Sequence, residues 1–361
     1  MSAADDTIAE EERDVDAASD PGAGAHGPVD EERAPRAAFV PPATTVVQVA
    51  APAKINLGLL VGPVRSDGFH EIFSPLLPVT LADLVTARPA PAGAGLAVEC
   101  DVAPGEDNLA ARAVRELERR LGRSFDVCLS IAKRVPAAAG LGGGSSDAAA
   151  ALTAVERLFE LDLPVRLRYE IAGAVGSDVP FFLWPGPQLA MGRGTVLKEI
   201  VLPEPLHIVI ALPGLALSTA DVYRWFTKRP DAPGTALAER RSFAARTQAL
   251  YARLSAARRP RDLTGVVDNE LEAPVVARHP EIGELKARLL AAGAFAAAMS
   301  GSGSSVFGLF SSAAGAQRAV VALAPLQAVY VTDLQPGDPA DLQPGDHDAP
   351  GQPPPEPHAP K

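Results

Sequence analysis

The stretch PAAAGLGGGSSD (136–147) determines how the rest of the chain is interpreted. Four of the five residues from 140 to 144 are glycine. The alternating segment DVCLSIAKRV (126–135) before it predicts a strand, and SSDAAAALTAVERLFEL (145–161) after it predicts a helix with a serine cap. A helix N-terminus directs free N–H groups and a positive dipole end at one point, and glycine lets the backbone approach an anion closely. The stretch therefore predicts a phosphate-binding loop.

This loop matches neither of two common nucleotide-binding motifs. No lysine follows the last glycine, as a P-loop requires, and the glycine spacing differs from the dinucleotide-binding fingerprint. A flexible linker or a tight turn is the alternative, but the flanking strand and helix favour phosphate binding. The predicted loop residues are Pro136, Ala137, Ala138, Ala139, Gly140, Leu141, Gly142, Gly143, Gly144, Ser145 and Ser146, and the Ser146 hydroxyl is a candidate magnesium ligand.

Two apolar segments contain charged residues that could take part in chemistry. Lys54 lies within APAKINLGL (51–59), and Asn56, two residues on, shares its face of the predicted strand. The pair predicts a polar floor, whereas the alternative for Lys54 is a strand-edge lysine in water. Asp178, in AVGSDVPFFLW, is either a turn cap or a carboxylate near that lysine. A nearby cation would keep the carboxylate ionised and favour the oxyanion of a substrate hydroxyl.

The segment SDGFHEI (66–72) places an aromatic ring, Phe69, beside His70 in a turn-rich region. A surface turn is one interpretation of this segment. The other is a ligand site, because a ring and a hydrogen-bonding imidazole suit a flat heterocycle.

The composition indicates a globular body with acidic tails. The chain has 361 residues, 47% apolar, with a net charge of −11. Residues 1–44 carry a net charge of −8 and residues 333–361 carry a net charge of −5, so residues 45–332 between them carry a net charge of +2. We expect both tails to be disordered. A near-neutral body admits an anionic small substrate and offers no basic stripe for nucleic acid.

No membrane span or signal peptide is expected, and the two cysteines, Cys100 and Cys128, have no metal-ligand spacing. We therefore expect a soluble, cytoplasmic protein. Helical and strand patterns mix without strict βαβ order, which favours an α+β fold of two lobes with a boundary near residue 203. The remaining predicted strands are 46–61, 81–90, 95–100 and 206–214, and the remaining predicted helices are 107–122, 236–257 and 281–292. The Gly/Ser-rich loop within 296–310, SGSGSS (300–305), is either a plain turn or a support for the first loop.

Together these segments resemble the GHMP kinase superfamily. The resemblance rests on seven segments in the family's order, spanning about residues 46–332: PAKINLGL, SDGFHEI, EDNLAARA, PAAAGLGGGSSDAAAAL, GSDVPFFL, PGLALSTADVY and SGSGSSVFGLF. It implies a two-lobed fold, with a lobe like ribosomal protein S5 domain 2 at 45–203 and a ferredoxin-like lobe at 204–332. It also implies an ATP- and Mg²⁺-dependent kinase, monomeric or a weak homodimer, that acts on a small molecule.

Within the superfamily, the segments Ala-Lys-Ile-Asn, Gly-Phe-His and Ser-Asp-Val-Pro-Phe-Phe are similar to the kinases of the non-mevalonate isoprenoid pathway. Those enzymes phosphorylate the 2-hydroxyl of a diphosphocytidyl methylerythritol. The resemblance implies that Asp178 is the catalytic base, that Lys54 is its cationic partner, and that the loop 136–146 holds ATP. It assigns substrate contacts to Asn56, Phe69, His70, Thr219 and Tyr223.

Two of these positions depart from the family pattern, which often has Tyr where this chain has Phe69 and Phe where it has Tyr223. Either ring can stack on a base, so the two exchanges affect only the hydrogen bonds that a tyrosine hydroxyl makes. Two alternatives remain open. One is a GHMP kinase acting on mevalonate, homoserine or a sugar, and the other is a nucleotide-binding regulator without chemistry.

Overall fold

The computed structural model describes residues 39–102, 107–229, 236–324 and 328–333. Most of the predicted tails, 1–44 and 333–361, lies outside these residues. The predicted start of the C-terminal tail is wrong by one residue, because Asp333 is the last residue of strand β12 (Ala328–Asp333). The mixture of helices and two separate sheets confirms the α+β expectation.

The first sheet is organised around the long strand β3 (His70–Pro89). The first part of β3 pairs with β2 (Gly58–Val64) and β6 (Gln188–Gly192), and the later part pairs with β1 (Val47–Asn56) and β5 (Val127–Ala132). The prediction of a strand starting at residue 81 is therefore wrong at its start, since the strand begins within the predicted turn segment 66–72. The sheet is completed by β4 (Leu96–Glu99), β7 (Val196–Glu199) and β9 (Asp268–Asn269).

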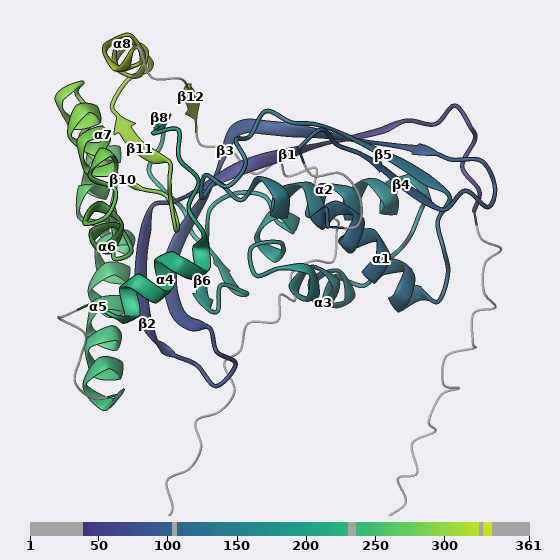
Figure 1. Ribbon diagram of the computed structural model, residues 1–361, viewed down its shortest axis with the longest axis horizontal. Helices are drawn as coiled ribbons and strands as arrows, with labels where there is room; N and C mark the ends of the chain where they lie inside the picture. The colour runs from purple at the N-terminus through teal and green to yellow at the C-terminus, as the bar shows by residue number, and fades with distance from the viewer. Residues whose placement is uncertain (1–38, 103–106, 230–235, 325–327, 334–361) are drawn as a thin grey trace, which may run out of the picture. The chain divides into compact units, whose positions relative to one another are not determined.

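Three helices cover one face of this sheet: α1 (Leu109–Leu121), α2 (Gly143–Leu158) and α3 (Val165–Val175) (Figure 1). The Asn108 side chain caps α1 by accepting from Ala110 N, and Gly122 ends it at φ 62°. The predicted serine cap of α2 is wrong. That helix begins at Gly143 after Gly142, which has no side chain to cap it.

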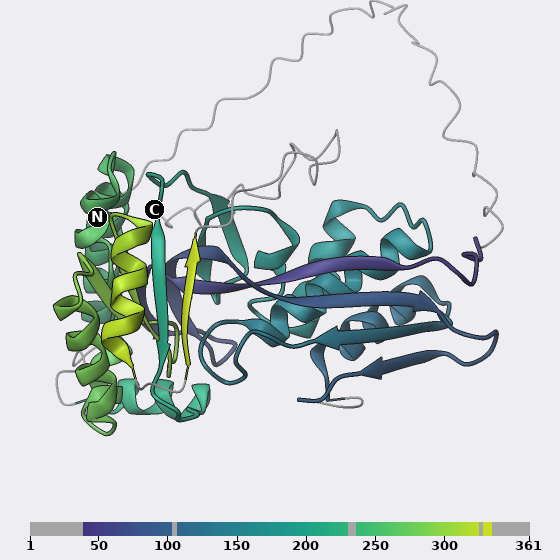
Figure 2. The same cartoon turned by 90° about the horizontal axis from the view of Figure 1, so that it is seen from above.

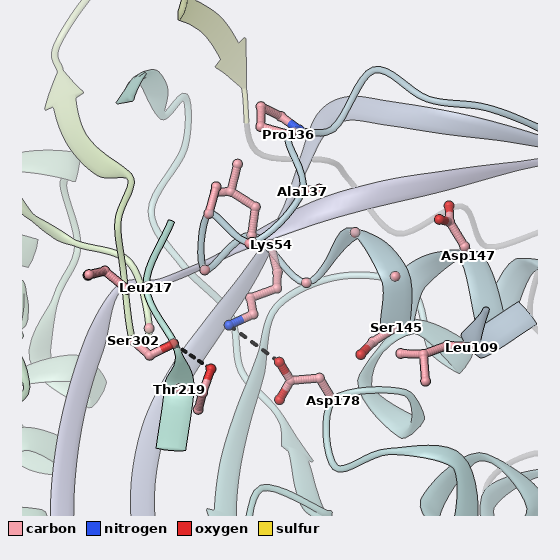
Figure 3. Close-up of a pocket in the computed structure, with 18 of the residues that line it drawn as sticks. Lys54, Leu109, Pro136, Ala137, Ser145, Asp147, Asp178, Leu217, Thr219 and Ser302 are labelled. Carbon is pink, nitrogen blue, oxygen red and sulfur yellow. Dashed lines mark hydrogen bonds and ion pairs between the residues drawn. The ribbon is translucent and has the colours of Figure 1, made fainter. Parts of the chain in front are cut away.

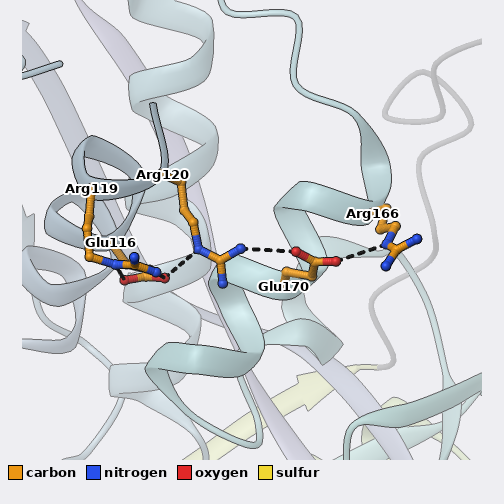
Figure 4. A network of polar contacts seen from close by, with 5 residues as sticks. All are labelled: Glu116, Arg119, Arg120, Arg166 and Glu170. Atoms are coloured by element: carbon orange, nitrogen blue, oxygen red, sulfur yellow. Dashed lines mark hydrogen bonds and ion pairs between the residues drawn. The ribbon is translucent and has the colours of Figure 1, made fainter. Parts of the chain in front are cut away.

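Helices α1 and α3 are joined at the surface by a chain of ion pairs (Figure 4). Glu116 pairs with Arg119 and Arg120 of its own helix, and Arg120 reaches Glu170 on α3, which also pairs with Arg166. The hydrogen bond from Arg119 lowers the pKa of Glu116 to about 2. Most of these groups reach solvent, so the network adds little stability per pair and mainly fixes how the two helices lie together.

The second sheet has the order β10–β11–β8–β12. Its strands are antiparallel neighbours: β10 (Ala296–Met299), β11 (Val306–Phe310), β8 (His207–Leu212) and β12. Helices α7 (Pro280–Ala291) and α8 (Ala313–Leu323) pack on it (Figure 2). The remaining helices are α4 (Thr219–Thr227), α5 (Ala236–Ala256), α6 (Glu272–Val276) and the 3₁₀ segments Pro180–Leu183 and Pro260–Gly265.

The two sheets share one apolar core. Ile55 and Leu77 of the first sheet belong to the same buried cluster as Ile208, Ile210 and Leu309 of the second. Because this cluster spans both sheets, the loops that leave them are held at fixed positions, and these loops carry the candidate site.

Candidate active site

The glycine loop lies between β5 and the N-terminus of α2, as the sequence predicts (Figure 3). Gly140 and Gly142 adopt φ values of 76° and 72°, which side chains rarely take. A Cβ added at Gly140 would lie 2.2 Å from the carbonyl oxygen of Ser300. Glycine is thus required here both by backbone conformation and by the close approach of the second Gly/Ser loop.

Lys54 is held beside this loop by main-chain and side-chain bonds. The β1–β3 register shifts between Pro52 and Ala53, an irregularity of the kind common next to functional sites. Just beyond it, Lys54 N donates to Leu141 O at 2.9 Å. The side chain is only 6% exposed, so its charge needs partners. Its Nζ donates to Asn56 Oδ1 at 2.6 Å and lies 3.5 Å from Asp178 Oδ2.

Asn56 lies on the same face of β1 as Lys54, as the alternation predicts. Its Nδ2 donates to Ser74 Oγ at 2.9 Å, and Ser74 Oγ donates to Gly58 O at 2.6 Å. This chain of bonds fixes the amide so that its oxygen faces the ammonium. Asp178 contrasts with the buried lysine, because its side chain is 41% exposed and therefore accessible to a bound molecule.

The second Gly/Ser loop, residues 300–305, supports the first. Ser305 N donates to Ala139 O at 3.1 Å, and Ser300 Oγ donates to Gly140 O at 3.2 Å. A third contact ties the loop to α4, since the Thr219 and Ser302 hydroxyls lie 2.9 Å apart. The interpretation of this loop as a support, rather than a plain turn, is confirmed.

A cavity of about 530 Å³ runs along these elements. Of the predicted residues, Phe69, His70 and Ser146 do not line it. Its wall includes Lys54, Asn56, Asp178, Thr219, Tyr223 and every loop residue from Pro136 to Ser145. Sequence reasoning missed several further lining residues, among them Cys100, Asn108, Leu109, Lys133 and Asp147, although the motif EDNLAARA contains two of them.

His70 lies next to the cavity through its contact with Tyr223, whose ring centroid is 5.4 Å away. The imidazole is oriented by Gly62 O, 2.8 Å from Nδ1, and by Thr227 Oγ1, 3.1 Å from Nε2. Phe69 is half exposed, with the Arg193 guanidinium 5.6 Å from its ring centroid. Burial, with a smaller effect from the Asp178 charge, raises the pKa of the Tyr223 phenol, so Tyr223 is neutral at physiological pH.

A buried ion cluster anchors the start of the glycine loop. Lys133 Nζ lies 2.5 Å from Asp83 Oδ2 and 2.6 Å from Asp147 Oδ2. Asp83 Oδ1 also accepts from Arg134 N at 2.5 Å and Val135 N at 2.7 Å. Burial, reinforced by the Asp83 charge and opposed by Lys133, raises the pKa of Asp147 to about 6. In the sequence, this cluster shows only as Lys133 just before the loop and Asp147 at the end of GSSD, and neither residue's surroundings indicate the other as its partner.

Comparisons with known proteins agree with this geometry. The family model of the GHMP kinases N terminal domain matches residues 108–186, and that of the GHMP kinases C terminal domain matches residues 249–325. A relative from Anaeromyxobacter sp. (strain K), named 4-diphosphocytidyl-2-C-methyl-D-erythritol kinase, is 41% identical over 292 residues, covering 76% of this chain and 83% of the relative. The chain belongs to the 4-diphosphocytidyl-2-C-methyl-D-erythritol kinase family of GHMP kinases. A relative of the same name from Gloeobacter violaceus is 39% identical and is covered over 90% of its length.

Solved structures agree with this membership. A crystal structure of 4-(cytidine 5'-diphospho)-2C-methyl-D-erythritol kinase, 34% identical, has a TM-score of 0.65 and covers 81% of this chain and all of its own. The L. major mevalonate kinase in complex with R-mevalonate, at 17% identity and TM-score 0.62, covers 82% of this chain and 99% of its own, and shares the fold. Among the described residues, no helix is both long and apolar enough to cross a membrane.

Proposed function

We propose that this chain transfers the γ-phosphoryl group of ATP to the 2-hydroxyl of 4-diphosphocytidyl-2-C-methyl-D-erythritol, a step of the methylerythritol phosphate route to isoprenoids. The observation that carries the proposal is the Lys54–Asp178 pair, 3.5 Å apart, in a cavity walled by the glycine loop. A cation and an accessible carboxylate beside a phosphate-binding loop are what phosphoryl transfer to an alcohol requires. The names of the relatives supply the substrate.

ATP would lie with its phosphates over the loop and the N-terminus of α2. Residues 140–145 line the cavity there, and the first turn of α2 leaves N–H groups without helical partners. The base and ribose would occupy the end of the cavity near Asn108, Leu109 and Lys133, which also line it. The predicted ATP contacts of Pro136 to Ser146 are part of this proposal.

In the transfer step, the substrate hydroxyl lies between Lys54 and Asp178, in line with the γ-phosphorus. Its oxygen forms a bond to phosphorus while the bond to the ADP oxygen breaks, and its proton passes to the Asp178 carboxylate. Lys54 stabilises the negative charge that develops on the oxygen. Because Lys54 is buried and fixed by Asn56, it needs little reorganisation during the step.

The loop fits a magnesium ion that arrives with ATP. Ser146 Oγ is buried without a hydrogen-bond partner, and Ser145 lines the cavity. Hydroxyl oxygens suit this hard cation, which in such sites keeps waters and substrate phosphates as most of its ligands. Among the described residues no cluster of three acidic, histidine or cysteine side chains could hold a metal. The Ser145 hydroxyl, which lines the cavity, would hold the ion, and the buried Ser146 hydroxyl behind it remains the candidate that the sequence named. When bound, the ion would neutralise phosphate charge.

The cytosine would stack near Tyr223, with His70 at its edge and Phe69 as the second ring. The support is the His70–Tyr223 ring contact beside the cavity. Thr219 and Asn56, which line the cavity, would contact the polyol part. We further propose a cytoplasmic enzyme, because the reaction consumes ATP, and a monomer or weak homodimer, which gel filtration would test.

A coupled ADP-release assay tests the proposal. Purified protein with ATP and Mg²⁺ is given the diphosphocytidyl methylerythritol, mevalonate or homoserine in parallel. ADP release with the first substrate alone is expected. Equal or greater turnover of mevalonate or homoserine would assign the chain to another GHMP activity. ATP binding without turnover of any alcohol would favour the alternative of a nucleotide-binding regulator without chemistry.

A further inference from the structure

The segment Asn269-Glu-Leu-Glu272, which joins β9 to α6, contains a buried amide that has no part in the proposed transfer step. Asn269 is 4% exposed and makes three side-chain hydrogen bonds. Its Nδ2 donates to Met299 O at 2.7 Å and to Gly301 O at 2.8 Å, and its Oδ1 accepts from Leu271 N at 2.9 Å. Both amide hydrogens are therefore used on the second Gly/Ser loop and the strand that leads into it.

Gly301 is the point where that loop meets the reacting groups. A Cβ added at Gly301 would lie 3.1 Å from Asn56 Oδ1 and 3.4 Å from Lys54 Nζ, so the backbone there packs against the ammonium and its amide partner. The preceding residue, Ser300, accepts from Asn56 N at 3.3 Å and donates to Gly140 O. The loop thus fills the space between Asn269 and the Lys54–Asn56 pair.

Glu272, at the other end of the same segment, provides a contrast with Asn269. Glu272 Oε2 accepts from Met299 N at 2.8 Å, and its Oε1 pairs with Lys286. Glu272 therefore holds the end of β10 in the same neighbourhood, but its carboxylate bonds to the strand and to α7 rather than to Gly301. If transfer depended only on the position of β10, removing Asn269 and removing Glu272 would have equal effects on it.

We infer that Asn269 is a positioning residue for phosphoryl transfer: by holding the Gly301 carbonyl it keeps the second loop against Lys54 and so fixes the ammonium relative to Asp178. The carbonyls of Met299 and Gly301 lose their amide donor when Asn269 is removed, and the loop can then move away from Lys54. The inference rests on the proposed function, because it concerns that reaction.

The test compares Asn269→Ala with Glu272→Ala in the ADP-release assay, using the full chain and correcting for the folded fraction. For Asn269→Ala we expect kcat to fall about tenfold or more with KM for both substrates within about threefold, because transfer geometry changes more than binding. For Glu272→Ala we expect a lower Tm with kcat per folded molecule within about twofold. Equal effects of the two changes on kcat would overturn the inference.

A double-mutant cycle with Lys54→Ala, read by single-turnover kinetics, separates positioning from a merely structural role. If Asn269 acts through Lys54, adding Asn269→Ala to Lys54→Ala should slow transfer by less than about twofold further. Full multiplication of the two effects would contradict the inference. If Asn269→Ala does not fold, Asn269→Asp, which keeps size and the acceptor for Leu271 N, takes its place in the cycle. An inactive wild-type protein would instead refute the proposed function.

Discussion

Replacing Lys133 by methionine should expose how strongly the glycine loop depends on its buried ion cluster. The side chains of Asp83 and Asp147 are 0% and 5% exposed, and both pair with the Lys133 ammonium. Methionine keeps most of the stem but leaves two buried carboxylates without their cation. Removing one partner of a buried pair costs about 3–5 kcal/mol, and we expect a loss of this size in unfolding free energy at pH 7.5.

The loss should depend on pH with a definite sign. The pKa of Asp147 in the folded protein, about 6, lies above its ordinary value of 3.8. Its contribution to stability is therefore fully present below about pH 4 and is lost as the pH rises through about 6. Lys133 lowers that pKa, so the variant should hold the proton to still higher pH. The variant's deficit relative to wild type should then shrink by about 1.4 kcal/mol or more on going from pH 7.5 to pH 5.

Urea denaturation followed by circular dichroism at both pH values measures these differences. Lys198→Met is the control, because Lys198 is an exposed lysine of β7 whose ammonium contacts the hydroxyl and ring of Tyr251 at the surface. It should change stability by less than about 0.5 kcal/mol. A Lys133→Met deficit below about 1 kcal/mol at pH 7.5, or one that is the same at both pH values, would refute the reasoning.

Two further predictions concern the glycine loop and the proposed cytosine contacts. Gly140→Ala should destabilise the protein by about 2 kcal/mol or more and lower kcat/KM for ATP at least tenfold, because φ at Gly140 is 76° and the added Cβ would meet Ser300 O. Gly93→Ala is the matched control, since Gly93 has φ 80° but open space around it. Equal losses of stability in thermal melts of the two variants would contradict this explanation. Combined Phe69→Ala and His70→Ala should raise KM for the diphosphocytidyl substrate at least fivefold with little change in kcat. Steady-state kinetics with an unchanged KM would remove both from the substrate site.

Helix α1 was predictable because its signals are local. The Asn108 cap and the Gly122 stop each act within one turn, and both are visible in the sequence. Helix α2 was misjudged at its start, since its first residue, Gly143, carries no helical signal and the serine that suggested a cap lies inside the helix. Helix α3 follows Pro164 without a side-chain cap or a first-turn acid, so it was not predicted.

The extent of β3 depends on tertiary pairing. Its first half is stabilised by β2 and β6, which local propensity cannot reveal. The same holds for the site. Lys54 and Asp178 stand out individually as charges in apolar surroundings. By contrast, the aspartates that pair with Lys133 lie 14 and 50 residues away along the chain, and the carbonyls that accept from the Asn269 amide lie 30 and 32 residues away. Such bonds form only once the chain has folded, and no short sequence motif predicts them.

The most direct test of the central claim is the kcat of Asp178→Asn and Lys54→Met with saturating ATP, Mg²⁺ and the diphosphocytidyl substrate, each variant being checked for native circular dichroism. Both changes nearly preserve side-chain size while removing the base or the cation of the 3.5 Å pair. We predict that each lowers kcat by about two orders of magnitude or more. Near-wild-type turnover in either folded variant would contradict the assignment of phosphoryl transfer to this pair.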